Sequence, residues 1–277
     1  MKRTISPLRY PGGKASLFSF VENIIKNNNL HGCTYVEPFA GGCGIGIKLL
    51  LGNICNKLII NDIDYHIYAF WYSAIFLTDE FCNIISETPI TIEEWHRQKH
   101  ISNNMHDYTI IEVGFSTFFL NRTNRSGILK AGPIGGKYQN GNYKLDCRFN
   151  KENLIKRIKT IANYRHQIEL YNLDVLELIP VLENRKDELL INFDPPYVEM
   201  GSELYLNFYK PEDHVELSNA IANQLKDKKW IITYDNKDLI KECYRNFYQT
   251  TINIQYSLQE KRLEKEILIY NNIIFSN

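Results

Sequence analysis

Long apolar runs are missing from this sequence of 277 residues. The longest, residues 68–77, is far shorter than the roughly 20 residues that a membrane-spanning helix needs. The N-terminus begins with basic residues, but no apolar stretch follows them, as it would in a secretory signal. We therefore expect no membrane span and no signal peptide, and a protein that works in the cytoplasm.

Paired metal or disulfide ligands are missing as well. The six cysteines are scattered and include no C-x-x-C pair, which argues against a zinc framework and a disulfide-stapled domain. His96 and His100 stand four apart on an expected helix, but no acidic residue follows at the spacing of a metal site. The sequence therefore predicts a protein without a bound metal.

The net charge of the whole chain is zero, since 32 basic residues balance 32 acidic ones, but the charges are unevenly distributed along the sequence. Residues 121–165 hold eleven basic and two acidic residues, a net charge of +9 that leaves −9 for the rest of the chain. The same segment is rich in glycine and carries Tyr138, Tyr143 and Phe149. This pattern is typical of a surface that binds nucleic acid phosphates, although a solvated loop before a charged helix would explain it equally well.

Short apolar runs alternate with helical patterns in two parts of the chain, which predicts an α/β fold with a mostly parallel sheet. The alternation stops between residues 65 and 165, where a helix at 107–120 precedes the glycine-rich stretch. We therefore expect a catalytic domain formed by residues 1–64 and 166–277, with an inserted subdomain at 65–165. The expected strands are 34–37, 57–61, 168–171, 189–193, 229–234, 250–255 and 267–275, the last two antiparallel, and further expected helices are 44–51 and 211–225.

The most specific motif is Asp194-Pro195-Pro196-Tyr197, directly after the apolar strand 189–193. Ligands of open α/β sheets bind beyond the carboxyl ends of the strands. The Asp194 carboxylate and the Pro195 carbonyl can accept both N–H groups of an aryl amine, and would stabilise the positive charge that grows as this amine attacks a methyl sulfonium. Tyr197 can stack on the base that carries the amine. A simple strand-ending turn is the alternative, and the position after a buried strand favours the functional interpretation.

A second motif, Glu37-Pro38-Phe39-Ala40-Gly41-Gly42, follows strand 34–37 and opens a helix. Glycines at such a turn let a ligand approach the backbone and the N–H groups of the helix. The spacing is not G-x-G-x-x-G, and Gly12-Gly13-Lys14 lacks both the first glycine and the Ser or Thr of a P-loop. The spacing of the glycines in these two segments therefore argues against binding of a dinucleotide or a nucleoside triphosphate.

Two acidic residues follow neighbouring expected strands. Asp62 comes after strand 57–61, where an acid would hold a ribose diol in a Rossmann-like site. Asp174 comes after strand 168–171, where a helix cap and a ligand contact explain the residue equally well.

Together these motifs resemble the Dam-type (adenine-specific amino) DNA methyltransferases. The resemblance runs from Arg9-Tyr10-Pro11-Gly12-Gly13-Lys14 through the glycine turn, Asn61-Asp62, Asp174 and Asp194–Tyr197 to the segments at 261–262 and 266–268. It implies a Rossmann-like S-adenosylmethionine-dependent methyltransferase sheet, with a helical target-recognition subdomain inserted before the catalytic tetrapeptide. It also implies duplex DNA as the partner, and a restriction or defence-system partner is open.

The resemblance, with the glycine turn and the basic segment, also predicts the site residues. The catalytic candidates are Asp194, Pro195, Pro196 and Tyr197; the cofactor-binding candidates are Tyr10, Lys14, Glu37, Phe39, Gly41, Gly42, Asp62, Asp174 and Asp194; and the DNA-binding candidates are Asn121, Arg122, Arg125, Lys130, Lys137 and Arg148.

Some positions depart from the family pattern. Cys43 stands where the last glycine of F-x-G-x-G is usual, and Arg125-Ser126-Gly127 stands where better-studied members have an aromatic residue, so the target sequence is open. The alternatives are the same chemistry on adenine in RNA or on the amine of cytosine, for which Ser is more usual than Asp194. A non-catalytic nucleic-acid-binding module is a further alternative, although it would not need both intact motifs.

Overall fold

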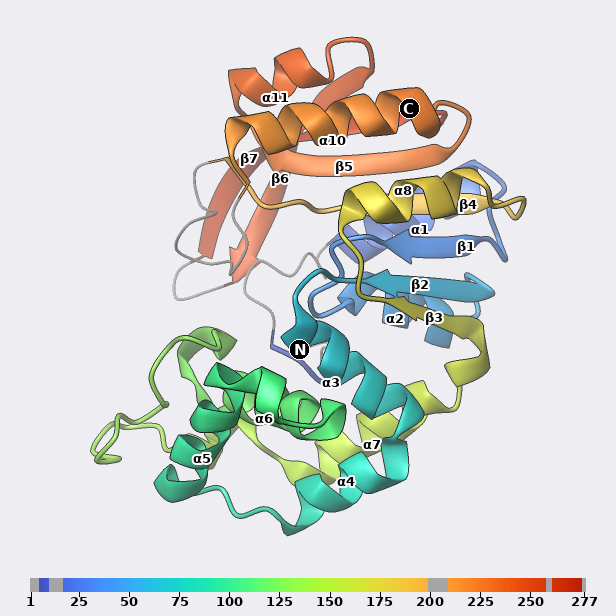
Figure 1. Cartoon of the computed structure of the whole chain (residues 1–277). Helices are drawn as coiled ribbons and strands as arrows, with labels where there is room; N and C mark the ends of the chain where they lie inside the picture. The colour runs from blue at the N-terminus through green and yellow to red at the C-terminus, as the bar shows by residue number, and fades with distance from the viewer. Residues whose placement is uncertain (1–4, 10–16, 199–208, 258–260, 276–277) are drawn as a thin grey trace. The chain divides into compact units, whose positions relative to one another are not determined.

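The computed structural model describes residues 5–9, 17–198, 209–257 and 261–275 (Figure 1). The chain divides into a helical unit, Met1–Gly13 with Tyr65–His166, and a sheet unit, Lys14–Asp64 with Gln167–Asn277. Within the described residues, every helix is too short or too polar to cross a bilayer.

The sheet unit contains a seven-stranded sheet in the order β3-β2-β1-β4-β5-β7-β6. Neighbouring strands are parallel as far as β5, whereas β7 is antiparallel to both β5 and β6. This confirms the predicted fold class and the antiparallel ending. The strands are β1 (Thr34–Glu37), β2 (Lys57–Asn61), β3 (Ile168–Tyr171), β4 (Leu189–Phe193), β5 (Lys229–Asp235), β6 (Tyr248–Ser257) and β7 (Lys261–Asn271).

The last two strands are longer than predicted. They pair from Tyr248 with Tyr270 to Ser257 with Lys261, so β7 begins six residues before the apolar run at 267. The segment that joins the two apolar runs is polar, and strands without an apolar face give no burial signal in the sequence.

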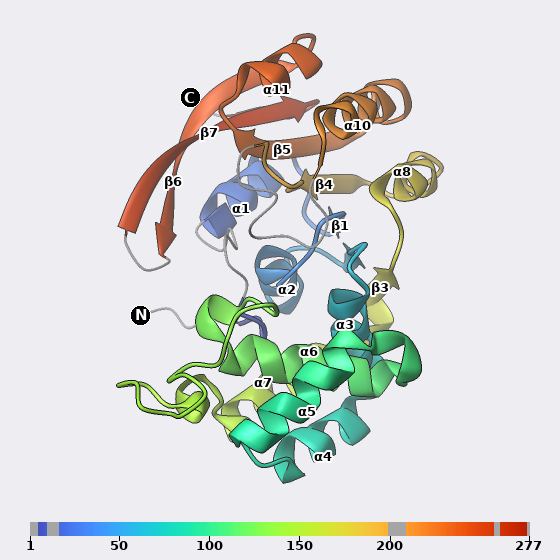
Figure 2. The same cartoon turned by 60° about the vertical axis from the view of Figure 1, so that its left-hand side comes forward.

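Helices cover both faces of this sheet (Figure 2). The apolar core on one face includes Ile191 and Phe193 of β4, Leu217 of α10 and Tyr244 beside α11, all at most 1% exposed. Each such side chain stabilises the fold by roughly 1.5–3 kcal/mol. The helices of this face are α8 (Val175–Glu183), α10 (Pro211–Gln224) and α11 (Asp238–Cys243), and α1 (Phe18–Asn27) and α2 (Gly44–Leu51) lie on the other face.

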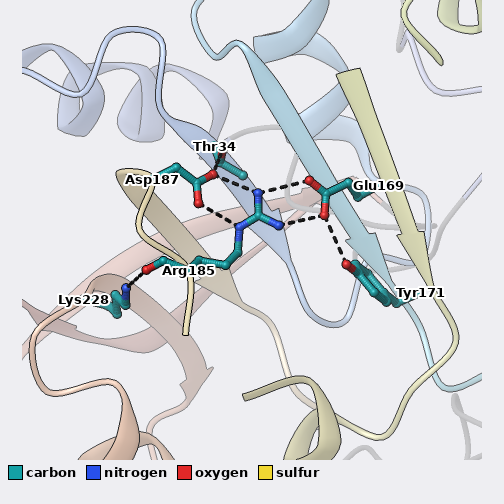
Figure 3. Close-up of polar contacts among 6 residues, drawn as sticks. All are labelled: Thr34, Glu169, Tyr171, Arg185, Asp187 and Lys228. Carbon is teal, nitrogen blue, oxygen red and sulfur yellow. Dashed lines mark hydrogen bonds and ion pairs between the residues drawn. The ribbon is translucent and has the colours of Figure 1, made fainter. Parts of the chain in front are cut away.

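A guanidinium clamp holds the end of the sheet at which β1 and β4 begin (Figure 3). Arg185 donates to both carboxylate oxygens of Glu169 at 2.7 and 3.0 Å and to both of Asp187 at 2.9 Å. Thr34 donates to Asp187 at 2.6 Å, and Tyr171 to Glu169 at 3.1 Å. The clamp therefore joins β3 to the start of β1 and to the segment before β4, although β3 is not a neighbour of either strand.

The helical unit packs around α6 (Ile110–Thr123), whose residues are mostly buried. Thr109 and Glu112 form a capping box, so this helix begins three residues later than predicted. Phe149, which the sequence suggested for a nucleic acid surface, is buried against Phe118 and Phe119. The other helices are α3 (Tyr65–Phe76), α4 (Thr78–Glu87), α5 (Ile92–Asn103) and α7 (Lys151–Ala162).

Residues 5–9 belong to the helical unit, whereas the sequence predicts residues 1–64 as part of the sheet domain. Asn121 of α6 accepts from the N–H of Arg9 and donates to its carbonyl, both at 2.7 Å. Arg122 and Arg157 donate to the carbonyls of Pro7 and Ser6, both at 3.3 Å. These long-range contacts leave no trace in local sequence patterns.

Candidate active site

The strand order reverses between β1 and β4, which are parallel neighbours. In open α/β sheets this is the position at which ligands bind, beyond the carboxyl ends of the strands. Glu37 ends β1 and Asp194 follows the last residue of β4, so both predicted motifs lie at this position. The two carboxyl groups are close enough that Asp194 helps to raise the pKa of Glu37.

The Asp194 loop leaves a strand whose five residues are all buried. Asp194 is half-buried, Pro195 is buried, and Tyr197 lies with its ring centroid 6.4 Å from that of Tyr234 on β5. The N–H of Val198 donates to the Asp235 carboxylate at 3.2 Å. The end of β5 therefore supports the loop that carries the predicted catalytic residues.

The glycine turn is built around the buried carboxyl of Glu37. Its Oε1 accepts from the N–H of Gly46 at 2.8 Å, and it is also hydrogen-bonded to the Cys43 thiol. Burial is the main reason that the pKa of Glu37 rises to about 7. Cys43 has a φ of +44°, in the left-handed region that favours glycine, which accounts for the usual glycine at this position. Glu37 thus holds the turn from inside.

Asp62 joins the glycine turn to the end of β2. Its two carboxylate oxygens accept from the N–H groups of Gly41 at 2.8 Å and Asp64 at 3.0 Å. Although the residue is partly exposed, its carboxyl group is closely surrounded, and this burial, with the neighbouring Asp64, raises its pKa to about 7. Each oxygen keeps a second lone pair for a further donor.

Asp174 caps α8. Its side chain accepts from the N–H of Leu176 at 2.8 Å, and Glu177 completes a capping box. This supports the helix-cap interpretation of the sequence, and any contact with a cofactor would be made by the same residue in addition.

Two further residues at the carboxyl ends of the strands were not among the predicted site residues. Asn61, buried at the end of β2, donates to the carbonyls of Pro38 at 2.9 Å and Leu173 at 3.1 Å, and accepts from the N–H of Leu173 at 3.0 Å. It thereby holds together the chain after β1, β2 and β3. The second is Tyr209, which packs edge-to-face on Phe39 with centroids 6.1 Å apart. Asn61 has a signal in the sequence, because it is a polar residue that ends an apolar strand. No comparable local signal marks Tyr209.

The candidates Phe39, Gly41, Gly42 and Asp62 thus gather near Asp194 at the carboxyl ends of β1, β2 and β4. Tyr10 and Lys14 lie outside the described residues. Among the residues that are described, no group of three or more His, Cys, Asp or Glu side chains is arranged to hold a metal ion.

The DNA-binding candidates lie in the helical unit and differ in exposure. Asn121 is only 3% exposed, and its amide bonds to the backbone of Arg9 and Gly127. We therefore assign it a supporting position under the loop rather than a contact with DNA. The exposed candidates are Arg125, Lys130, Lys137 and Arg148.

Arg122 stands in a cluster of guanidinium groups. Burial, followed by repulsion from Arg9, Arg157 and Arg148, lowers its pKa to about 9. It donates to the carbonyls of Arg148 at 2.8 Å and Pro7 at 3.3 Å. In the described part of the chain, no carboxylate is among the groups that shift the pKa of Arg122 or Arg9.

Comparisons with known proteins agree with this geometry. The family model of the D12 class N6 adenine-specific DNA methyltransferases matches residues 10–258. A type II methyltransferase of Methanocaldococcus jannaschii, M.MjaIII, is 24% identical over 223 residues, which cover 74% of this chain and 73% of the relative.

Similarity to solved structures is low. A protein from Pyrococcus horikoshii aligns with 96% of this chain and 88% of its own, at 9% identity and a TM-score of 0.42. An rRNA methyltransferase from Streptomyces viridochromogenes aligns with 92% of this chain and 84% of its own, at 10% identity and a TM-score of 0.37. The family match spans the glycine turn, the basic segment and Asp194–Tyr197 alike. The chain therefore belongs to the D12 class of N6 adenine-specific DNA methyltransferases.

Proposed function

We propose that this adenine-specific DNA methyltransferase transfers a methyl group from S-adenosylmethionine to the exocyclic amine of an adenine flipped out of duplex DNA, and that Asp194 directs the reaction. One observation carries the proposal. Asp194 follows a fully buried strand at the point where the strand order reverses, beside the glycine turn and close enough to influence the Glu37 carboxyl.

The amine of adenine is a weak nucleophile because its lone pair is delocalised into the ring. The Asp194 carboxylate and the Pro195 carbonyl accept its two N–H groups, which favours a tetrahedral nitrogen and stabilises the charge that develops during attack. The two prolines hold these acceptors rigidly, because their φ angles are fixed. Tyr197, half-buried and supported by Tyr234, offers a ring on which the base stacks.

The residues beside Asp194 fit the cofactor. Asp62 keeps lone pairs for the two hydroxyls of a ribose, and Phe39 is half-buried beside the glycine turn, with Gly41 at a φ of +46°. The buried acids Glu37 and Asp62 also favour a ligand with positive charge. When bound, S-adenosylmethionine supplies an electrophilic methyl group on a sulfonium.

The helical unit supplies the contacts with DNA in this proposal. Arg122, Arg9 and Arg148 repel one another, so phosphate oxygens nearby would stabilise all three. Arg125, Lys130 and Lys137 are exposed in the same unit and are further candidates for phosphate contacts. Flipping the adenine costs a few kcal/mol, which these phosphate contacts offset.

The test is the transfer of labelled methyl groups from S-adenosylmethionine to unmethylated genomic DNA, to the same DNA after denaturation, and to total RNA, with the modified positions read by sequencing. We expect N6-methyladenine at one short motif in duplex DNA. Preference for RNA or denatured DNA would contradict the duplex proposal, and methylated cytosine would contradict the assigned base.

A further inference from the structure

His214, on α10, is a fully buried ionisable side chain that the proposed chemistry does not use. It is 0% exposed, and its Nδ1 lies 2.9 Å from the hydroxyl of Tyr234. Its Nε2 is buried and has no hydrogen-bond partner among the described residues. Burial lowers the pKa of His214, partly opposed by Asp235 and Asp213, which favours the neutral ring.

A buried polar ring with one unpaired nitrogen is costly. Leaving such a group unsatisfied costs roughly 1–3 kcal/mol, and a phenylalanine would fill the position without that cost. The hydrogen bond to Tyr234 is therefore the feature that distinguishes histidine from an apolar ring here.

His214 is also the centre of a chain of ring contacts. On one side, its centroid lies 5.3 Å from that of Tyr209, which packs on Phe39 at 6.1 Å. On the other side, it lies 5.4 Å from Tyr234, which contacts Tyr197 at 6.4 Å. Aromatic pairs at these separations attract one another beyond simple burial.

The two ends of this series of ring contacts belong to the two motifs of the site. Phe39 belongs to the glycine turn after β1, and Tyr197 belongs to the tetrapeptide after β4. Both end residues are half-buried, whereas His214 and Tyr234 in the middle are fully buried. The middle of this series of ring contacts is therefore held in the core, while its two ends are partly exposed at the carboxyl ends of the strands.

We propose that His214 is a positioning residue for both motifs. It fixes the position of the glycine turn through Tyr209 and Phe39, and it fixes the position of the base-binding tetrapeptide through Tyr234 and Tyr197. The inference rests on the proposed function for the roles of Phe39 and Tyr197. One buried ring thereby fixes the methyl-donor side and the acceptor side of the reaction relative to each other. An error of about 1 Å in such an arrangement lowers the rate about a hundredfold.

The experiment measures two quantities for each variant: the Kd for S-adenosylhomocysteine without DNA, by calorimetry, and kcat on saturating genomic DNA. We expect His214→Leu, which removes the ring contact with Tyr209 as well as the hydrogen bond to Tyr234, to raise the Kd about fivefold and to lower kcat about tenfold. His214→Phe keeps the ring and loses only the hydrogen bond, so it should lower kcat and leave the Kd close to that of the wild type. Tyr234→Phe, which interrupts only the tetrapeptide side, should lower kcat and leave the Kd unchanged. His214→Gln, whose amide can still bond to Tyr234, should recover part of the rate.

Tyr244→Phe is the matched control. The Tyr244 ring lies 6.3 Å from Tyr234, and its buried hydroxyl has no partner among the described residues. The change removes a hydroxyl from the same core without touching the chain of contacts, and both measured quantities should stay as in the wild type.

Stability is separated from positioning by the double variant His214→Phe/Tyr234→Phe. Removing both partners leaves neither buried group of the pair unsatisfied, so the melting temperature should recover while kcat stays low. Recovery of kcat together with the melting temperature would overturn the inference, as would a wild-type Kd and kcat in His214→Leu. If the wild type binds S-adenosylhomocysteine but methylates no DNA, the proposed function fails, and the Kd of His214→Leu compared with that of Tyr244→Phe still decides the inference.

Discussion

The sheet unit and the helical unit carry opposite unbalanced charges. In the sheet unit, burial raises the pKa of both Glu37 and Asp62 to about 7, and the neighbours that raise them further, Asp194 and Asp64, are also acids. In the helical unit, burial lowers the pKa of Arg122 to about 9, and the neighbours that lower it further are also arginines. Each unit thus concentrates one sign of charge at a cost in folding stability.

The guanidinium clamp of the sheet unit shows how this protein arranges charges that serve only structure. Arg185 is matched by two carboxylates, which raise its pKa, and it lowers the pKa of Asp187. Opposite signs are paired at the end of the sheet away from the motifs, and like signs are grouped at the candidate sites. This difference fits the ligands that we propose, a cationic methyl donor for the sheet unit and the phosphates of DNA for the helical unit.

The largest effect in this comparison is expected for Asp194→Ala, which tests the catalytic role of the sheet unit. We expect kcat for methyl transfer to fall by about 10³-fold, because an acceptor for the developing positive charge is lost. The Kd for S-adenosylhomocysteine and the affinity for DNA should stay within about threefold of wild type. Asp238→Ala, whose side chain is fully exposed, is the control. Retention of more than a tenth of the wild-type kcat would contradict the assigned role.

Arg185→Ala tests the paired end of the sheet. We expect the free energy of unfolding to fall by about 2 kcal/mol, less than for a fully buried ion pair because Glu169 and Asp187 are partly exposed. The folded-state pKa of Asp187 is lowered, so its stabilisation is present at neutral pH and lost as the pH falls below about 4. Urea unfolding at neutral pH and below about pH 4 measures this: the difference in unfolding free energy between the wild type and Arg185→Ala should be smaller at the acidic pH.

The control for the clamp is Arg245→Ala, which removes an exposed pair with Glu242. This change should alter the free energy of unfolding by less than about 0.5 kcal/mol. Equal losses in Arg185→Ala and Arg245→Ala would mean that the clamp contributes no more than a surface pair.

Arg148→Gln and Arg122→Gln test the positive side of the comparison. Each should weaken DNA binding about tenfold and reduce the slope of log K against log salt by about 1. Arg122→Gln should also remove repulsion within the cluster. Arg245→Gln in the sheet unit is the control, and an unchanged salt slope in both cluster variants would place the DNA contacts elsewhere.

The smallest effect concerns pH. Because the pKa of Asp62 is raised to about 7, its carboxyl is protonated below this value and ionised above it. Ribose hydroxyls donate more strongly to a carboxylate, so the affinity for S-adenosylhomocysteine should rise a few-fold between about pH 6 and 8. Asp62→Asn should remove this dependence, as measured by calorimetry. A pH profile in Asp62→Asn that matches the wild type would assign it to another group.

Local patterns in the sequence were sufficient to predict β1, β2 and β4, because each is a short, mostly apolar run that is buried in a parallel sheet. The edge strand β3 was predicted as well, although only its first residue is buried. Local patterns were insufficient where the sequence of a strand is mostly polar, as in the first part of β7. The start of α6 depended on a single capping box, which the apolar pattern does not reveal.

The candidate site divides in the same way. Asp194 and the glycine turn follow buried strands, so their place at the sheet edge could be predicted. His214 and Tyr209 could not, because their importance lies in contacts with residues far away in the sequence. Asn121 resembled a surface residue of the basic segment, and only the folded chain shows its amide holding Arg9.

The most direct test of the division between chemistry and DNA binding is the single-turnover rate of methyl transfer as a function of DNA concentration, for the wild type, Arg122→Gln and Asp194→Ala. We predict that Arg122→Gln needs about ten times more DNA but reaches the wild-type rate at saturation. Asp194→Ala should bind DNA as the wild type does and stay slow at every concentration. A saturating rate that is low in Arg122→Gln, or a slow rate in Asp194→Ala that more DNA restores, would contradict the account.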